Sequence, residues 1–217
     1  MKIDFEKILK KKTAFDRINP AKREKIMIAA VDEFADKGYH LASTSRIAKR
    51  AGIAKGALFK YFKTKERLFL SITDELLIDM FVYIMKRISA RKQVDILTLY
   101  MDGVEELFDY FKGNLKMFRL YKMIISERSG EVFHKIRKKY EPYMAPMVES
   151  LMKKVDRSNL SVSMQEMGKL FIWLDAGMDA YVMSIVTPNT TVDEMKKIYK
   201  ENLAIVEKVL KNGIYKK

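Results

Sequence analysis

Regular spacing of apolar residues, with few interruptions, limits this chain to helical folds. Its 217 residues include only nine glycines and four prolines, the residues that most often end helices and strands. Between them, apolar side chains recur every three or four positions, which is the period of an α-helix. No segment alternates like a half-buried strand for more than a few residues. The sequence therefore predicts an all-α fold.

Capping residues set the limits of the expected helices. Asn19-Pro20 starts one helix and Gly38 ends it, Ser43 or Thr44 starts the next, and Thr64 caps a later one. The helices are expected at about 20–37, 43–51, 55–62, 64–87, 94–112, 114–128, 131–155, 162–187 and 192–212. Two prolines, Pro142 and Pro146, are expected to kink or split the helix over 131–155. Thr191 to Glu194 has the pattern of a capping box.

Positive charge is concentrated near the N-terminus. Residues 1–70 carry 18 Lys and Arg against 8 Asp and Glu, whereas residues 71–217 carry 24 against 20. Such a basic segment is typical of a domain that meets a polyanion such as DNA. A general lysine bias is the alternative explanation, but it would raise both segments alike.

Other functional classes find no support in the residues. The chain has no cysteine, which excludes disulfides, thiolate metal sites and cysteine nucleophiles. His40 and His134 are its only histidines and lack metal-ligand spacing, and no phosphate-binding glycine loop or serine nucleophile motif occurs. We therefore expect no enzyme, no metal and no cofactor. The start lacks a signal peptide, and the apolar stretch 170–188 contains Asp175 and Asp179, so we expect a cytoplasmic protein without a membrane span.

Two short helices joined by a glycine-containing turn form the pattern of a helix-turn-helix. The turn covers residues 52–54, and the small side chains of Ala48 and Ala51 allow the helices to cross closely. The second helix is then free to enter a DNA major groove. Hydroxyl and cationic side chains suited to phosphate contacts face outward. An ordinary solvated helix pair is the alternative interpretation.

A dense series of matching positions extends from Ile26 to Leu68. The series consists of Ala29-Ala30, Phe34, Lys37-Gly38-Tyr39, Thr44, Ile47-Ala48, Ala51-Gly52-Ile53, Lys55-Gly56, Leu58-Phe59, Tyr61-Phe62 and Lys65-Glu66. It resembles the DNA-binding domain of the TetR family. The resemblance implies a homodimeric transcriptional regulator whose second domain binds a small ligand. Beyond residue 68 the chain shares only the family's all-α plan and usual length.

The resemblance also implies which residues meet DNA. Thr44, Ser45 and Arg46 would open the first helix of the motif against the DNA backbone. The second helix and the start of the next would contribute Lys55, Gly56, Ala57, Phe59, Lys60, Tyr61 and Lys65, with Tyr61 and Lys65 as clamps on phosphates.

Three positions depart from the usual family pattern. Ala54 stands where a serine N-cap is common, which costs about 1 kcal/mol of local helix stability. Ala57 replaces a usual Ser or Thr, and Phe59 a usual Tyr. Two hydroxyl contacts are therefore expected to be absent, and lysines on the same helix would compensate electrostatically with a steeper salt dependence.

The segment after residue 80 is rich in methionine and aromatic side chains. This is typical of a helical core and also of an adaptable apolar ligand cavity. The candidate residues for a largely apolar small-molecule effector are Phe108, Phe118, Tyr121, Trp173 and Tyr181. Asp175 and Asp179 are expected at an exposed helix edge or beside a lysine, with a cationic ligand as the alternative.

A stripe of small residues marks the same helix. Ala176, Ala180 and Ser184 recur every four positions and would allow close helix packing across an isologous homodimer interface. Packing within one chain is the alternative.

The sequence therefore predicts an N-terminal three-helix helix-turn-helix domain followed by a C-terminal helical ligand-binding and dimerisation domain. The expected limits are 1–19 for an arm or short helix, 20–65 for the DNA-binding head and 66–217 for the second domain. The expected function is a homodimeric repressor, bound to a palindromic double-stranded DNA operator and released by a small ligand. The alternatives are a ligand-independent regulator, an activator, or a DNA tether with a protein-interaction module.

Overall fold

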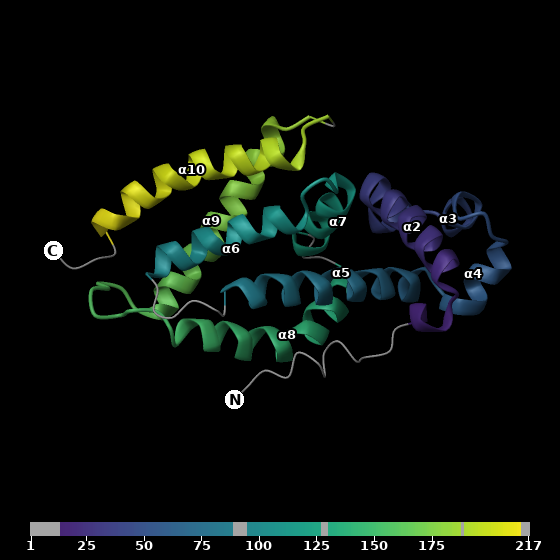
Figure 1. Ribbon diagram of the computed structural model, residues 1–217, viewed down its shortest axis with the longest axis horizontal. Coiled ribbons are helices and arrows are strands. Elements are labelled where there is room, and N and C mark those ends of the chain that lie inside the picture. Colours follow the sequence, from purple (N-terminus) through teal and green to yellow (C-terminus); the bar gives the residue numbers. More distant parts are fainter. Residues whose placement is uncertain (1–13, 89–94, 127–129, 188, 214–217) are drawn as a thin grey trace. The chain divides into compact units, whose positions relative to one another are not determined.

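The computed structural model describes residues 14–88, 95–126, 130–187 and 189–213, apart from the side chains of residues 14, 126, 143–147 and 183 (Figure 1). Within these ranges all regular elements are helices, which confirms the all-α fold. The elements are η1 (Ala14–Arg17), α2 (Pro20–Leu41), α3 (Thr44–Arg50), α4 (Lys55–Phe62), α5 (Lys65–Ile88), α6 (Ile96–Tyr110), α7 (Leu115–Ser126), α8 (Glu131–Met152), α9 (Met164–Ile185) and α10 (Val192–Gly213).

The chain divides into two compact units. The first combines Met1–Tyr83 with Lys116–Val148, and the second combines Ile84–Leu115 with Glu149–Lys217. The first unit thus holds α7 and most of α8 in addition to the head, which we define as residues 20–65. The functional boundary at residue 65 stays a prediction, because it concerns which residues bind DNA and which bind an effector.

Helix α2 begins at the residue that the sequence indicates, and its regular path breaks at Gly38, where the sequence predicts its end. The Asn19 side chain accepts a hydrogen bond from the amide of Ala21 at 3.1 Å, and Pro20 occupies the first helical position. Gly38 has φ 69° and ψ 170°, which breaks the helical path before one further turn up to Leu41. A left-handed φ of this kind favours glycine because it has no Cβ.

Aromatic side chains form the centre of the first unit. The Phe69 ring of α5 lies 4.9 Å from the Phe34 ring and 5.0 Å from the Tyr39 ring, both measured between centroids. Phe133 of α8 lies 5.8 Å from Phe69. Rings at such separations in tilted or edge-to-face arrangements attract one another beyond their burial. This cluster joins α2, α5 and α8.

The segment before α2 also contributes to this core. Phe15 in η1 is fully buried, and its ring packs edge to face on Phe62 of α4 at 5.0 Å. The expected N-terminal arm is therefore a 3-10 turn packed on the head over residues 14–17. The remainder of the arm, residues 1–13, lies outside the described residues.

The second unit is built from α6, α9, α10 and the ends of α5 and α8. Its core cluster includes Ile88, Ile96, Leu97, Leu160 and Met167, and α10 packs against both α6 and α9. Capping boxes start the last two helices. Ser163 and Glu166 exchange hydrogen bonds at the start of α9, and Thr191 and Glu194 do so at the start of α10, as expected.

The structure tests two further expectations. Helix α8 runs unbroken through Pro142 and Pro146, so the expected split is wrong. Asp175 is exposed, as one of the expectations had it, and Asp179 is half-buried. The Tyr100 hydroxyl donates to Asp175 at 2.5 Å, and the Tyr199 hydroxyl donates to Asp179. Tyrosine satisfies these carboxylates because its ring packs with the apolar side chains while its hydroxyl reaches the oxygen.

None of the helices in the described ranges is both long and apolar enough to span a membrane.

Candidate nucleic-acid interface

Helix α3 is anchored by its cap and by one apolar face. The hydroxyl of Ser43, and not that of Thr44, caps the helix by accepting a hydrogen bond from the Arg46 amide at 3.4 Å. Ile47 is fully buried and Ala48 almost so. These contacts leave the polar side of α3 exposed.

A tight turn connects α3 to α4. Gly52 has φ 67°, its amide donates to the Lys49 carbonyl at 3.2 Å, and the Ile53 amide donates to the Ala48 carbonyl at 3.0 Å. This pair of bonds is a Schellman motif, which requires a left-handed residue at the position of Gly52. The turn therefore fixes the direction in which α4 leaves α3, as a helix-turn-helix requires.

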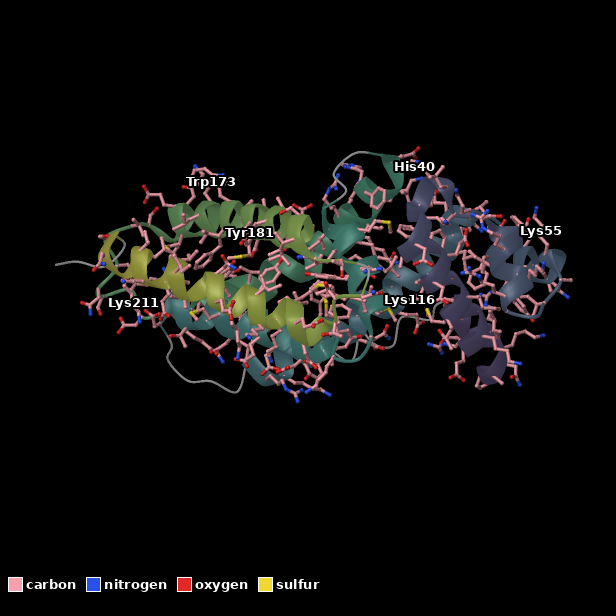
Figure 2. All side chains as sticks on the ribbon, turned by 90° about the horizontal axis from the view of Figure 1, so that it is seen from above. His40, Lys55, Lys116, Trp173, Tyr181 and Lys211 are labelled. Carbon is pink, nitrogen blue, oxygen red and sulfur yellow. The ribbon has the colours of Figure 1, made fainter. Side chains whose placement is uncertain are left out.

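Helix α4 has one buried and one exposed face. Leu58 and Phe62 are buried on the inner side, whereas Lys55, Gly56 and Lys60 are exposed on the outer side. Figure 2 shows Lys55 at the outer end of the head. Ala54 has N-cap geometry but makes no side-chain hydrogen bond, as expected from the missing serine. The outer face thus presents two lysines and a position without a side chain.

The predicted DNA-binding residues divide into two groups by exposure. The exposed group is Ser45, Arg46, Lys55, Gly56 and Lys60, and the half-buried group is Thr44, Ala57, Phe59, Tyr61 and Lys65. Within the half-buried group, the ring of Phe59 lies under the ammonium of Lys55, 5.8 Å from ring centroid to Nζ. The structure thus places both groups on α3, on α4 or at the start of α5, and their contacts with DNA stay predictions.

Two of the predicted phosphate ligands have protein partners. The Lys65 ammonium donates to the carbonyls of His40 at 2.9 Å and Ala42 at 3.3 Å, and it lies 4.9 Å from the Tyr39 ring centroid. Arg46 donates to the carboxylate of Glu33 and to the Leu41 carbonyl. Both cations therefore hold residues 40–42, where α2 ends and the chain turns towards α3.

The turn from α4 into α5 exposes a lysine that sequence reasoning did not single out. Lys63 has φ 64° and ψ −45°, and the Thr64 amide donates to the Phe62 carbonyl across it at 2.7 Å. This is a γ-turn of the rare positive-φ form. The Thr64 hydroxyl then caps α5 by accepting from the Arg67 amide at 3.1 Å, as expected. The only sequence signal for Lys63 is its place between two helix caps.

The predicted effector-binding aromatics lie in different environments. Phe108 is buried in the second unit with its ring 4.9 Å from that of Tyr199. Phe118 is buried in the first unit, where Tyr121 is partly buried. The remaining two are exposed on α9, Trp173 to 69% and Tyr181 to 50%.

An exposed apolar surface runs along α9 and α10. On α9 the two aromatics share one face with the predicted small-residue stripe, and Ala176, Ala180 and Ser184 are all exposed there. Figure 2 shows Trp173 pointing outward from α9. Further large apolar side chains are exposed on the two helices: Ile172 and Ile185 on α9, and Ile205 and Val209 on α10. We call this surface the α9–α10 face.

The described residues offer no group of three or more His, Cys, Asp or Glu side chains that could hold a metal ion.

Comparison with known proteins identifies the head. Residues 26–72 match the family model described as bacterial regulatory proteins of the tetR family. The HTH-type transcriptional activator FasR of Mycolicibacterium smegmatis is 30% identical over 99 residues, which are 46% of this chain and 44% of that protein. The fatty acid metabolism regulator protein of Bacillus subtilis is 46% identical over 50 residues, 23% of this chain and 26% of that protein. The chain thus spans less than half the length of these curated relatives.

The likeness in fold extends over more of the chain. The crystal structure of the transcriptional regulator FadR from Bacillus subtilis in complex with stearoyl-CoA covers 83% of this chain and 96% of its own, with a TM-score of 0.58 and 18% sequence identity. At this identity the likeness shows the fold alone. The head matches the family model, and the helical body has the fold of a family regulator. Residues 26–72 thus resemble the bacterial regulatory proteins of the tetR family, and the chain shares its fold with a solved transcriptional regulator.

Proposed function

We propose that this chain is a homodimeric transcriptional regulator that binds a palindromic DNA operator through α3 and α4. The observation that carries the proposal is the geometry of the helix-turn-helix. The Schellman turn at Gly52 fixes α4, the apolar side of α4 is buried, and its outer side presents Lys55, Gly56 and Lys60. Cations and a bare backbone on one helix face fit the edges of a major groove and its phosphates.

The α9–α10 face supports the dimer. Exposed large apolar side chains that gather on one part of a protein mark association sites, and α9 and α10 expose several of them. Small residues at Ala176, Ala180 and Ser184 would allow α9 to approach its copy closely, and Trp173 and Tyr181 would be covered there. We therefore assign these two aromatics to the dimer interface in place of the effector cavity. Two heads related by a two-fold axis would read half-sites about 34–36 Å apart.

For the effector we propose an amphiphile with a long acyl chain, such as an acyl-CoA. Support comes from the relatives, since one is named as a regulator of fatty acid metabolism and FadR is described in complex with stearoyl-CoA. Binding would lower the operator affinity by a coupling of about 1–3 kcal/mol.

Selection of genomic fragments by the purified protein at about 150 mM salt tests the DNA-binding part, because this salt suppresses non-specific phosphate contacts. An enriched inverted repeat is expected, and the absence of any enrichment would overturn the proposal. Titration of the repeat with stearoyl-CoA, with free CoA as the control, then tests the effector. Equal operator affinity with and without the acyl-CoA would reject it.

A second candidate function is activation of transcription. One observation favours it: FasR, which matches 46% of the chain, is named as an activator. A reporter gene placed behind the selected repeat distinguishes repression from activation. Repression gives higher expression when the regulator gene is deleted, and activation gives lower expression.

A further inference from the structure

Glu33 is a buried charge in the middle of the head. Its side chain is 1% exposed, on the inner face of α2 beside Ala29, Ala30 and Phe34. A carboxylate in such surroundings is strongly disfavoured unless other groups compensate its charge. Glu33 therefore depends on the partners that neighbouring elements supply.

Those partners come from the start of α3. The Oε1 atom of Glu33 accepts hydrogen bonds from the Ser43 amide at 2.9 Å and from the Arg46 side chain at 2.8 Å for Nε and 2.5 Å for Nη2. The Nη1 atom of Arg50 lies 3.9 Å from the second oxygen. The bonds from Arg46 hold the pKa of Glu33 below its ordinary value of 4.5, although burial acts in the opposite direction.

The same bonds neutralise Arg46. Its Nη2 atom also donates to the Leu41 carbonyl at 3.0 Å. The Nε and Nη2 atoms of the guanidinium thus both donate to protein oxygens. Yet the side chain remains 50% exposed, which leaves it room to turn outward if its partner were removed. From the sequence, this arginine is expected on the DNA backbone, but the structure assigns its donors to Glu33 and Leu41.

We propose that Glu33 is a positioning residue that keeps Arg46 away from the DNA phosphates. This inference rests on the proposed DNA-binding function and makes it quantitative. Each phosphate that a protein neutralises adds about 0.9 to the slope of log affinity against log salt concentration. With Arg46 held by Glu33, each head neutralises one phosphate fewer than its exposed cations would suggest.

The test uses full-length protein and a random-sequence DNA duplex of about 30 base pairs, with affinity measured by fluorescence anisotropy from about 50 to 200 mM salt. Glu33→Gln keeps the shape and the acceptor oxygen but removes the charge that holds Arg46. We expect the slope of Glu33→Gln to be steeper by about 0.9 for each head on the duplex. For two heads, the variant would lose about tenfold more affinity than the wild type over this fourfold salt range.

Matched variants identify the cation responsible. Arg46→Gln is expected to keep the wild-type slope, and the double variant Glu33→Gln/Arg46→Gln is expected to lose the added steepness. Lys60→Gln on the exposed face of α4 is the positive control, with a slope that is shallower by about 0.9 per head. A purely structural role for Glu33 would lower the affinity without changing the slope.

Two results would overturn the inference: an unchanged slope for folded Glu33→Gln, or a shallower slope for Arg46→Gln. If thermal unfolding shows that these variants do not fold, the ¹⁵Nε–H signal of Arg46 in wild-type protein decides the question. A signal unmoved by the duplex supports the inference, and a shifted signal rejects it. Wild-type protein that binds no duplex even at about 50 mM salt would instead reject the proposed function.

Discussion

Glu33 and Arg46 illustrate how single residues shape the head. A buried carboxylate whose pKa is lowered in the folded state stabilises that state above the pKa of the unfolded chain, and this contribution is lost as the pH falls. Bonds from Arg46 and from the Ser43 amide lower the pKa of Glu33 below 4.5. Protonation of Glu33 at low pH therefore lowers the stability of the head.

We expect the free energy of unfolding to fall more steeply below pH 4.5 in the wild type than in Glu33→Gln, because the variant has no proton to take up there. Urea denaturation at pH 7, 5, 4 and 3 measures the difference. Glu131→Gln is the matched control: its carboxylate also has a lowered pKa, from a hydrogen bond with Lys135, but it is 81% exposed. It should follow the wild type closely. Parallel pH profiles for all three proteins would contradict the linkage.

At the scale of elements, the helix caps of α3 and α4 differ in one respect. Both cap residues have extended backbone angles, but Ser43 makes a side-chain cap bond and Ala54 makes none. The backbone at Ala54 is thus already suited to a capping hydroxyl. A side chain that completes the missing cap hydrogen bond at this position should therefore stabilise the protein.

Ala54→Ser is therefore expected to raise the free energy of unfolding by about 1 kcal/mol, and Ser43→Ala to lower it by about the same amount. Urea denaturation at pH 7 measures both. Ser45→Ala, exposed on the first turn of α3, is the control and should change stability by no more than about 0.5 kcal/mol. If Ala54→Ser unfolds at the same urea concentration as the wild type, the cap at this position is not open to improvement.

Patterns of neighbouring residues predicted where the helices begin and end. They could not predict hydrogen bonds between side chains and groups that lie far apart in the sequence. The turn at Gly52 and the caps at Ser43 and Thr64 depend on residues within a few positions, so their patterns are visible in the sequence. Arg46 binds a residue 13 positions away and Lys65 one 25 positions away. Spacing along the chain holds no information on such pairs, so the protein partners of these two cations were not predicted, and their contacts with DNA stay predictions.

At the scale of the whole molecule, the α9–α10 face is the proposed site at which two copies associate. Its periodic apolar pattern predicted a helix face, but periodicity is the same for a core, a cavity and an interface. Only exposure separates them. The structure exposes Trp173 and Tyr181, and for this reason they move from the predicted effector site to the proposed interface.

A charge placed on this face should separate the dimer. We expect Ile205→Glu to sediment as a monomer of 25.4 kDa, while the wild type sediments at twice that mass, because the buried glutamates would lose their hydration on association. Ile28→Glu is the control, since Ile28 on α2 is 55% exposed and Ile205 64%. This variant should remain dimeric. If Ile205→Glu is still a dimer, the interface lies elsewhere. If the wild type is a monomer, the proposed dimer is wrong.

The exposure of Trp173 also makes the chain its own optical probe. It is the single tryptophan among 217 residues, so the whole indole emission reports on one point of α9. In the separated chain that ring faces water and should emit at long wavelength, and covering it in a dimer should shift the emission to the blue and shield it from iodide. A dilution series read in a fluorimeter would then give the dissociation constant of unlabelled protein, and the same signal would follow how fast two chains meet.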